Sequence, residues 1–137
     1  MEEQGAMALY KRYIRAFEEK DYEVIADACR TPFFVSSPVG TTVFEDRAAL
    51  IDGFAHLRGS LDENGYVRSR LNTLAFSKVA TTTGTLFVDF ERMNAADDAY
   101  FHGQALYLFQ QHQTGLDITG IVVLDDATVS IVQSISP

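Results

Sequence analysis

The hydrophobic positions in the first part of the chain recur with the period of a helix. Within residues 4–19, apolar side chains fall at i, i+3, i+4 and i+7, which places four of them on one helix face: Tyr10, Tyr13, Ile14 and Phe17. Asp21 stands where an N-cap belongs, so a second helix should follow and run to about Cys29. Thr31-Pro32 should end it, because the residue before a proline avoids the helical region.

A third helix is expected to begin near Asp46 and to end at the turn sequence of residues 62–65. Its apolar positions share one face: Leu50, Ile51, Phe54, Leu57 and Leu61. Between the second and third helices, residues 33–35 form a short apolar run that is typical of a strand. Residues 37–40 have the composition of a turn.

After Gly65 the pattern becomes that of strands. Runs rich in Thr, Val, Phe, Leu and Tyr cover residues 66–77, 79–92, 99–112 and 116–124, with turn signals at 94–98 and 113–115. Helices followed by long consecutive strands predict an α+β fold, with three N-terminal helices packed on one face of a curved antiparallel sheet. Such a sheet can leave a cone-shaped pocket between the two layers.

Side-chain alternation along two of these strands separates a pocket face from an outer face. If Tyr107 faces the pocket, the following residues share its face: Phe101, Gly103, Ala105 and Phe109, with Leu86, Val88 and Phe90 on the preceding strand. The small residues Gly103 and Ala105 should leave room for a cavity. Asp89 and His102 then point outward and should lie roughly opposite each other, unless a β-bulge reverses one strand.

Composition limits the classes of function. The 137 residues suit a single domain, and 11 Lys+Arg against 19 Asp+Glu give a net charge of −8. This charge argues against nucleic acid and against anionic membranes as partners. A single cysteine, Cys29, excludes an internal disulfide framework and a thiolate zinc site. The start of the chain lacks the basic region of a signal peptide, so a cytoplasmic protein is expected.

No cofactor and no metal are expected. The three histidines, His56, His102 and His112, fall on separate predicted elements without the paired spacing of a metal site. Gly40, Gly65 and the other turn glycines show no phosphate-loop spacing.

Three segments resemble the superfamily of nuclear transport factor 2 (NTF2) and ketosteroid isomerase, which includes SnoaL-like cyclases. They are residues 10–21 (YKRYIRAFEEKD), 22–25 (YEVI) and 33–40 (FFVSSPVG). The resemblance implies a cystatin-like, cone-shaped barrel enclosing a ligand pocket. It also implies one domain over residues 1–137, with a core of about 4–125, and assembly as a homodimer.

The isomerase branch of that superfamily permits a comparison residue by residue. Its oxyanion-hole tyrosine matches Tyr13, and its general-base aspartate falls on Ser37. Its second oxyanion donor, a protonated aspartate, falls on Tyr107. A serine hydroxyl cannot take a proton from carbon near neutral pH without a base of its own. The resemblance therefore argues against the isomerase mechanism in this chain.

Two readings of the function remain open. The first is a binding protein for a small apolar or carbonyl-bearing ligand, contacted by Tyr13, Ser37, Tyr107, Phe90 and Phe101. If it is catalytic, as an isomerase, dehydratase or cyclase, Tyr13 and Tyr107 would be the electrophilic donors and Asp89 or His102 the base. The plain alternatives are core tyrosines, a turn serine and an ion pair on the outer face.

The second reading is a non-catalytic association module. Tyr100, Leu106 and Leu108 would be apolar anchors on the outer face of the sheet, surrounded by neutral polar side chains such as Gln104 and Gln110. A homodimer formed through this face would leave the pocket free, so both readings can hold in one molecule.

Overall fold

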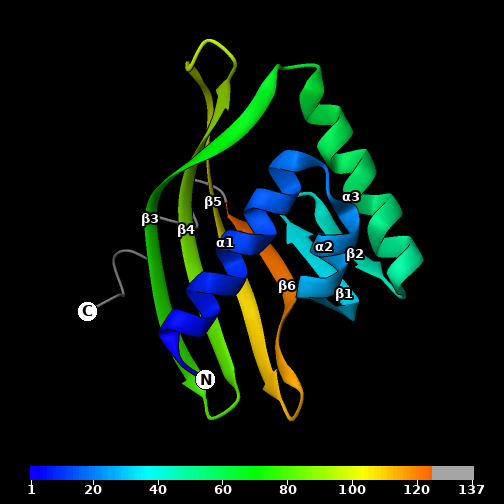
Figure 1. The fold of residues 1–137 in the computed structure, drawn as a ribbon, viewed down its shortest axis with the longest axis vertical. Helices are drawn as coiled ribbons and strands as arrows, with labels where there is room; N and C mark the ends of the chain where they lie inside the picture. Colours follow the sequence, from blue (N-terminus) through cyan, green and yellow to red (C-terminus); the bar gives the residue numbers. More distant parts are fainter. Residues whose placement is uncertain (125–137) are drawn as a thin grey trace.

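The computed structural model describes residues 1–124 and confirms an α+β fold with three helices and a curved six-stranded sheet (Figure 1). The elements run in this order: α1 (Glu3–Glu19), α2 (Tyr22–Ala28), β1 (Cys29–Ser37), β2 (Gly40–Phe44), α3 (Arg47–Asp62), β3 (Tyr66–Ala80), β4 (Thr83–Asn94), β5 (Ala99–His112) and β6 (Gly115–Leu124). The helices lie against one face of the sheet.

The strand order is β2-β1-β6-β5-β4-β3, with β2 and β3 at the two edges. The cone-shaped barrel implied by the resemblance is thus a curved sheet that stays open. All neighbouring pairs are antiparallel except β1 and β6, which run parallel. The expected antiparallel sheet therefore contains one parallel pair, because β6, which ends the antiparallel meander β3–β6, also lies beside β1.

Some boundaries differ from those expected. β1 begins at Cys29 and not at residue 33, and β2 was not expected: only its first residue, Gly40, lies in the predicted turn. β2 is a largely exposed edge strand, so its side chains carry no alternation of apolar and polar residues. The β3–β4 turn lies at residues 81–82, a few residues later than expected, within a Thr-rich stretch that lacks a hydrophobic pattern.

The helix starts are set by the aspartates that the sequence indicated. Asp21 accepts a hydrogen bond from the backbone N–H of Val24 (3.3 Å), and Asp46 accepts one from Ala49 (2.9 Å). Each carboxylate pairs one of the N–H groups that a helix start leaves free. α1 ends where Lys20 adopts a left-handed conformation, with φ of 61°.

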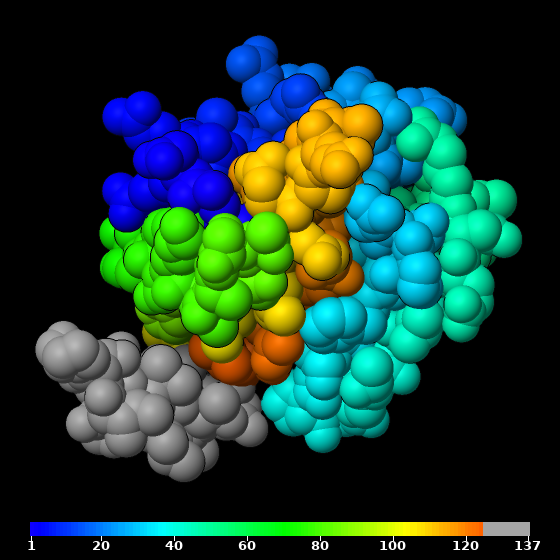
Figure 2. All heavy atoms as spheres, turned by 90° about the horizontal axis from the view of Figure 1, so that it is seen from below, coloured from blue at the N-terminus to red at the C-terminus, as the bar shows by residue number. Residues whose placement is uncertain are grey.

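The aromatic face of α1 forms the centre of the core. The Tyr10 ring packs on Tyr107 of β5, with centroids 4.8 Å apart, and Phe17 packs on Tyr66 of β3 at 5.9 Å. Tyr13 reaches Phe54 of α3 at 6.0 Å. One helix face thus holds the sheet and α3 together. Seen from below, the first residues of α1 lie beside the β3–β4 turn and the β5–β6 turn (Figure 2).

Arg58 of α3 joins the end of α1 to the core. Its side chain is 5% exposed, and it donates hydrogen bonds to the carbonyl oxygens of Phe17 (3.0 Å) and Glu18 (3.1 Å) and to Asp62 (2.7 Å). Its guanidinium also lies 4.7 Å from the centroid of the Tyr66 ring. The last turn of α1 contains no basic residue, so Arg58 supplies the positive charge that a helix C-terminus favours.

Arg58→Met should lower the free energy of unfolding by about 2–4 kcal/mol, because it removes three hydrogen bonds of a buried guanidinium, two of which go to carbonyl groups at the end of α1. Lys20→Met is the matched control. Lys20 pairs with the same carboxylate, Asp62, at 2.8 Å, but it is about half exposed, so its loss should cost less than about 1 kcal/mol. Chemical denaturation measures both values. Equal losses in the two variants would contradict a special role for Arg58.

Candidate functional site

A cavity of about 160 Å³ lies between α1 and the inner face of the sheet. Its wall is largely apolar and includes Ile14, Phe17, Leu57, Val35 and Ile121. Leu57 was expected in the buried face of α3, but it is 45% exposed and lies at the cavity wall. The polar side chains at this wall are few, among them Tyr10, Tyr107, Ser69 and Arg92.

The strand register confirms the expected inner face along the middle of β4 and β5, but His102 and Gln104, which were expected on the outer face, also line the cavity. Phe90 pairs with Gly103, Val88 with Ala105 and Leu86 with Tyr107. Leu86, Val88, Ala105 and Tyr107 are buried in the core, so this set faces the helices.

Gly103 has a different role from the one expected. A Cβ atom there would lie 2.6 Å from the ζ carbon of Phe90 and 2.7 Å from an ε carbon of Phe101. The space above this glycine is therefore filled by two phenyl rings, with centroids 6.3 Å apart, and is not empty. Phe90 and Phe101 both line the cavity.

Three tyrosines meet at the inner end of the site. The Tyr107 ring lies 4.8 Å from Tyr10 and 5.5 Å from Tyr13, centroid to centroid. Tyr10 and Tyr107 line the cavity, whereas Tyr13 is not among the lining residues and packs behind Tyr107. A direct ligand contact for Tyr13, as the sequence suggested, is therefore not supported by its position.

Burial raises the pKa of all three phenols. For Tyr10 and Tyr13 the charge of Tyr107 adds to this effect. Burial raises the pKa of Tyr107 to about 12, although its neighbours Tyr13 and Tyr10 lower it somewhat through their hydroxyl groups. All three groups are thus neutral hydrogen-bond donors at physiological pH.

Ser37 lies outside the cavity. Its hydroxyl accepts a hydrogen bond from the Val39 N–H (3.3 Å) and donates one to the Gly40 carbonyl (3.4 Å) in the β1–β2 turn. Ser37 is not among the cavity-lining residues and the turn uses its hydroxyl, so its position does not support the predicted ligand contact. The alternative, a turn-forming serine, describes the structure.

Asp89 and His102 do interact, but with a different register from the one expected. Asp89 pairs with Gln104 and His102 with Glu91, so the contact is diagonal, with His102 Nε2 2.9 Å from each carboxylate oxygen of Asp89. Asp89 also accepts hydrogen bonds from Asn72 (3.0 Å) and Gln104. His102 lines the cavity and Asp89 does not.

The carboxylate of Asp89 is a poor base. Its partial burial disfavours the charge, but hydrogen bonds from Asn72, Gln104 and His102 outweigh this and lower its pKa. Because these donors stabilise the ionised form, Asp89 is suited to hold His102 in place and not to accept a proton from a ligand.

Two residues near the site were not predicted from the sequence. Arg92 of β4 lines the cavity, and alternation from Val88 and Phe90 would have placed it there. Glu18, on the polar side of α1, is half-buried and accepts a hydrogen bond from the N–H of Ser69 (2.8 Å). Burial raises the pKa of Glu18. Its contact depends on how α1 crosses β3, for which the sequence carries no signal.

Tyr100 also departs from its expected place on the outer face. It packs against the core, and its hydroxyl is buried without a hydrogen-bond partner among residues 1–124. The cause is a register shift between β4 and β5, where Arg92 pairs with Phe101 but Met93 pairs with Ala99. Such a bulge changes the face to which the following side chains point.

Within residues 1–124, no group of three or more His, Cys, Asp or Glu side chains is arranged to hold a metal ion. In the same part of the chain, none of the helices combines the length and apolar character needed to cross a membrane. The cytoplasmic location stays a prediction.

Raising the pH above 10 should destabilise the fold through the three clustered phenols. In the unfolded chain they ionise near pH 10, whereas in the fold they stay neutral to about pH 12 or beyond. Their contribution to the free energy of unfolding is therefore complete below pH 10 and is lost progressively above it. Denaturation at pH 9 and pH 11 measures the loss, and Tyr107→Phe should reduce its pH dependence. Ionisation of all six tyrosines near pH 10 in the intact fold would contradict this.

Comparison with known proteins identifies relatives of this chain. The family model described as NTF2-like protein (DUF6841) matches residues 2–126, and no curated protein matches. An NTF2-like protein with a cystatin-like fold from Novosphingobium aromaticivorans is 17% identical, with a TM-score of 0.70 over 95% of this chain and 88% of that one. Aln2 from a Streptomyces species is 14% identical, with a TM-score of 0.70 over 93% of each chain.

A protein from Streptomyces avermitilis, provisionally described as a dehydratase of the NTF2-like family, is 11% identical. Its TM-score is 0.67, over 88% of this chain and 92% of that one. At these identities the solved structures show a shared fold and no shared chemistry. The family match covers nearly the whole described chain, and this chain therefore belongs to the NTF2-like family DUF6841.

Proposed function

We propose that this protein binds a small, largely apolar molecule that presents an oxygen acceptor, such as a carbonyl group, to the cavity. The observation that carries the proposal is the pairing of Tyr10 and Tyr107 at an otherwise largely apolar wall. A buried hydroxyl that can pair with a ligand oxygen gives orientation, while the apolar wall gives affinity.

The site favours binding over the proton transfer of an isomerase. Tyr107 could polarise a carbonyl oxygen as a neutral donor. The position expected to carry the general base is Ser37, whose hydroxyl is bonded within the β1–β2 turn. Three hydrogen-bond donors lower the pKa of Asp89, so its carboxylate is a weak base. One solved structure with a similar fold is provisionally described as a dehydratase. If this protein is an enzyme, we propose acid-assisted chemistry on the bound ligand.

Tyr107→Phe should weaken binding of a single-ring ketone such as acetophenone by about 1–3 kcal/mol, because one buried hydrogen bond is lost while the ring remains. Tyr22→Phe is the matched control, since Tyr22 lies on α2 and does not line the cavity. Titration calorimetry or chemical-shift titration gives the affinities. An unchanged affinity in Tyr107→Phe would refute the role of this phenol.

A second candidate function is association through the outer face of the sheet. One row of directly paired residues crosses four strands there and is apolar throughout: Ala75, Phe87, Leu106 and Val122. Leu108 lies in the neighbouring row, and the Phe34 ring covers Gly120. The three helices lie on the opposite face of the sheet (Figure 1). We propose a second copy of this chain as the partner, because such a row can pair with itself about a two-fold axis.

Leu106→Arg should convert the proposed dimer to a monomer, because it places a charge in the middle of the apolar row. Val79→Arg is the control, since Val79 is 65% exposed near the end of the edge strand β3 and lies outside that row. Sedimentation velocity reports the oligomeric state. A wild-type protein that is monomeric at micromolar concentration would contradict the dimer and leave the cavity proposal intact.

A further inference from the structure

We infer that the ligand of this cavity is a carboxylate and that Arg92 is its counter-ion. The inference rests on the proposed function, because it names the chemical class of the molecule that the cavity binds. Arg92 is a charged side chain at a largely apolar wall.

Arg92 is held by two phenyl rings. Its guanidinium carbon lies 4.5 Å from the ring centroid of Phe101 and 5.6 Å from that of Phe90, and all three residues line the cavity. Gly103 allows this arrangement, because a Cβ atom there would collide with both rings. Stacking on aromatic faces restrains the plane of the guanidinium and leaves its N–H edge available.

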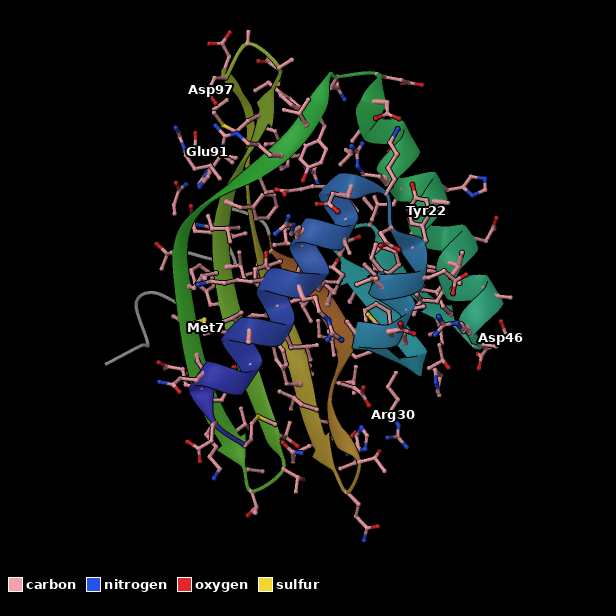
Figure 3. All side chains as sticks on the ribbon, viewed as in Figure 1. Met7, Tyr22, Arg30, Asp46, Glu91 and Asp97 are labelled. Carbon is pink, nitrogen blue, oxygen red and sulfur yellow. The ribbon has the colours of Figure 1, made fainter. Side chains whose placement is uncertain are left out.

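Residues 1–124 supply no counter-charge to Arg92. Within this part of the chain its guanidinium makes no ion pair or hydrogen bond, and nearby carboxylates have other partners. Glu91 pairs with Arg70 (2.7 Å), and Asp97 pairs with Arg68. Glu91 and Arg92 are adjacent in β4, so their side chains point to opposite faces of the sheet. Figure 3 shows Glu91 and Asp97 toward the end of the sheet where β4 turns into β5.

The surroundings of Arg92 are phenolic. Partial burial lowers its pKa, and the groups that oppose this effect are Tyr100, Tyr66, Tyr107 and Tyr13. An arginine that is partly removed from water is normally paired with a carboxylate or phosphate. In a chain with a net charge of −8, a cation at a cavity wall that has no charged partner among residues 1–124 is a local feature that attracts an anion.

The remaining lining residues favour a carboxylate over a phosphate. Among the described residues, Arg92 is the only arginine or lysine at the cavity wall, and Tyr10 and Tyr107 add neutral donors, which suits a monoanion. Glu18, which binds the backbone of Ser69 at the wall, would oppose a second negative charge on the ligand. The volume is close to that of a cavity of about 150 Å³ that holds one benzene ring, so a single ring carrying a carboxylate is the appropriate probe.

The test compares benzoate and phenylacetate with their amides, benzamide and phenylacetamide, by titration calorimetry on the full chain. Each acid and its amide share shape and differ in charge. The wild-type protein should bind the acids at least about tenfold more tightly than the amides, as expected for a charge-assisted pair with arginine. Arg92→Gln should remove that preference while retaining weak binding of the amides. Arg92→Lys should restore part of it, because the charge returns without the planar fork.

Arg70→Gln is the matched control. It removes one positive charge from the strand next to β4, but Arg70 is exposed and does not line the cavity, so the preference should remain. Thermal unfolding of each variant establishes that it is folded. Gly103→Ala gives an independent check, because displacement of the two rings should weaken acid binding although Arg92 is still present.

The outcomes separate this inference from the proposal on which it rests. Amides that bind as tightly as the acids, or an acid preference that survives in folded Arg92→Gln, would overturn the carboxylate assignment and leave a cavity for neutral ligands. Failure of every acid and amide to bind the folded wild-type protein at millimolar concentration would overturn both.

Discussion

The packing of one aromatic helix face on a curved sheet is the interaction on which the rest of this structure depends. Tyr10, Tyr13 and Phe17 of α1 are nearly inaccessible to solvent and contact β5, α3 and β3. The same contacts position Tyr10 and Tyr107 at the cavity wall. Arg58 fixes the end of α1 by bonding to its last carbonyl groups. The residues that stabilise the fold therefore also determine the geometry of the site.

Local signals in the sequence were sufficient for most of the fold. The caps Asp21 and Asp46 and the apolar period of α1 gave the helices, and the alternation along β4 and β5 gave the inner face. The edge strand β2 and the parallel pairing of β1 with β6 could not be predicted in this way. Both depend on which distant strand supplies the hydrogen bonds, and no local pattern encodes that choice.

The candidate site was predictable only in part, for related reasons. Tyr107, Phe90 and Phe101 follow from alternation and do line the cavity. The same alternation places Arg92 on the inner face. It was not predicted there because charged residues are rarely buried in a core. The contact of Glu18 with Ser69 joins residues 51 positions apart and depends on helix placement. Tyr100 faces the core and not the outside because a bulge in β5 interrupts the alternation of side chains at this residue.

The structure combines two surfaces for which we propose separate roles. The inner face carries the cavity, with phenols and one cation at an otherwise largely apolar wall, and the outer face carries an apolar row across four strands. Because the sheet separates them, self-association would leave the cavity accessible. The match to the NTF2-like family accounts for the scaffold, whereas the placement of Arg92 between Phe90 and Phe101 is a property of this chain's own residues.

A crystal structure of the protein with 3-bromobenzoate would test the central claim most directly, because anomalous scattering locates the bromine without ambiguity. We expect bromine in the cavity between α1 and the sheet, with the carboxylate within hydrogen-bond distance of the Arg92 guanidinium. Bromine at sites outside the cavity only, or a carboxylate turned away from Arg92 toward solvent, would contradict it.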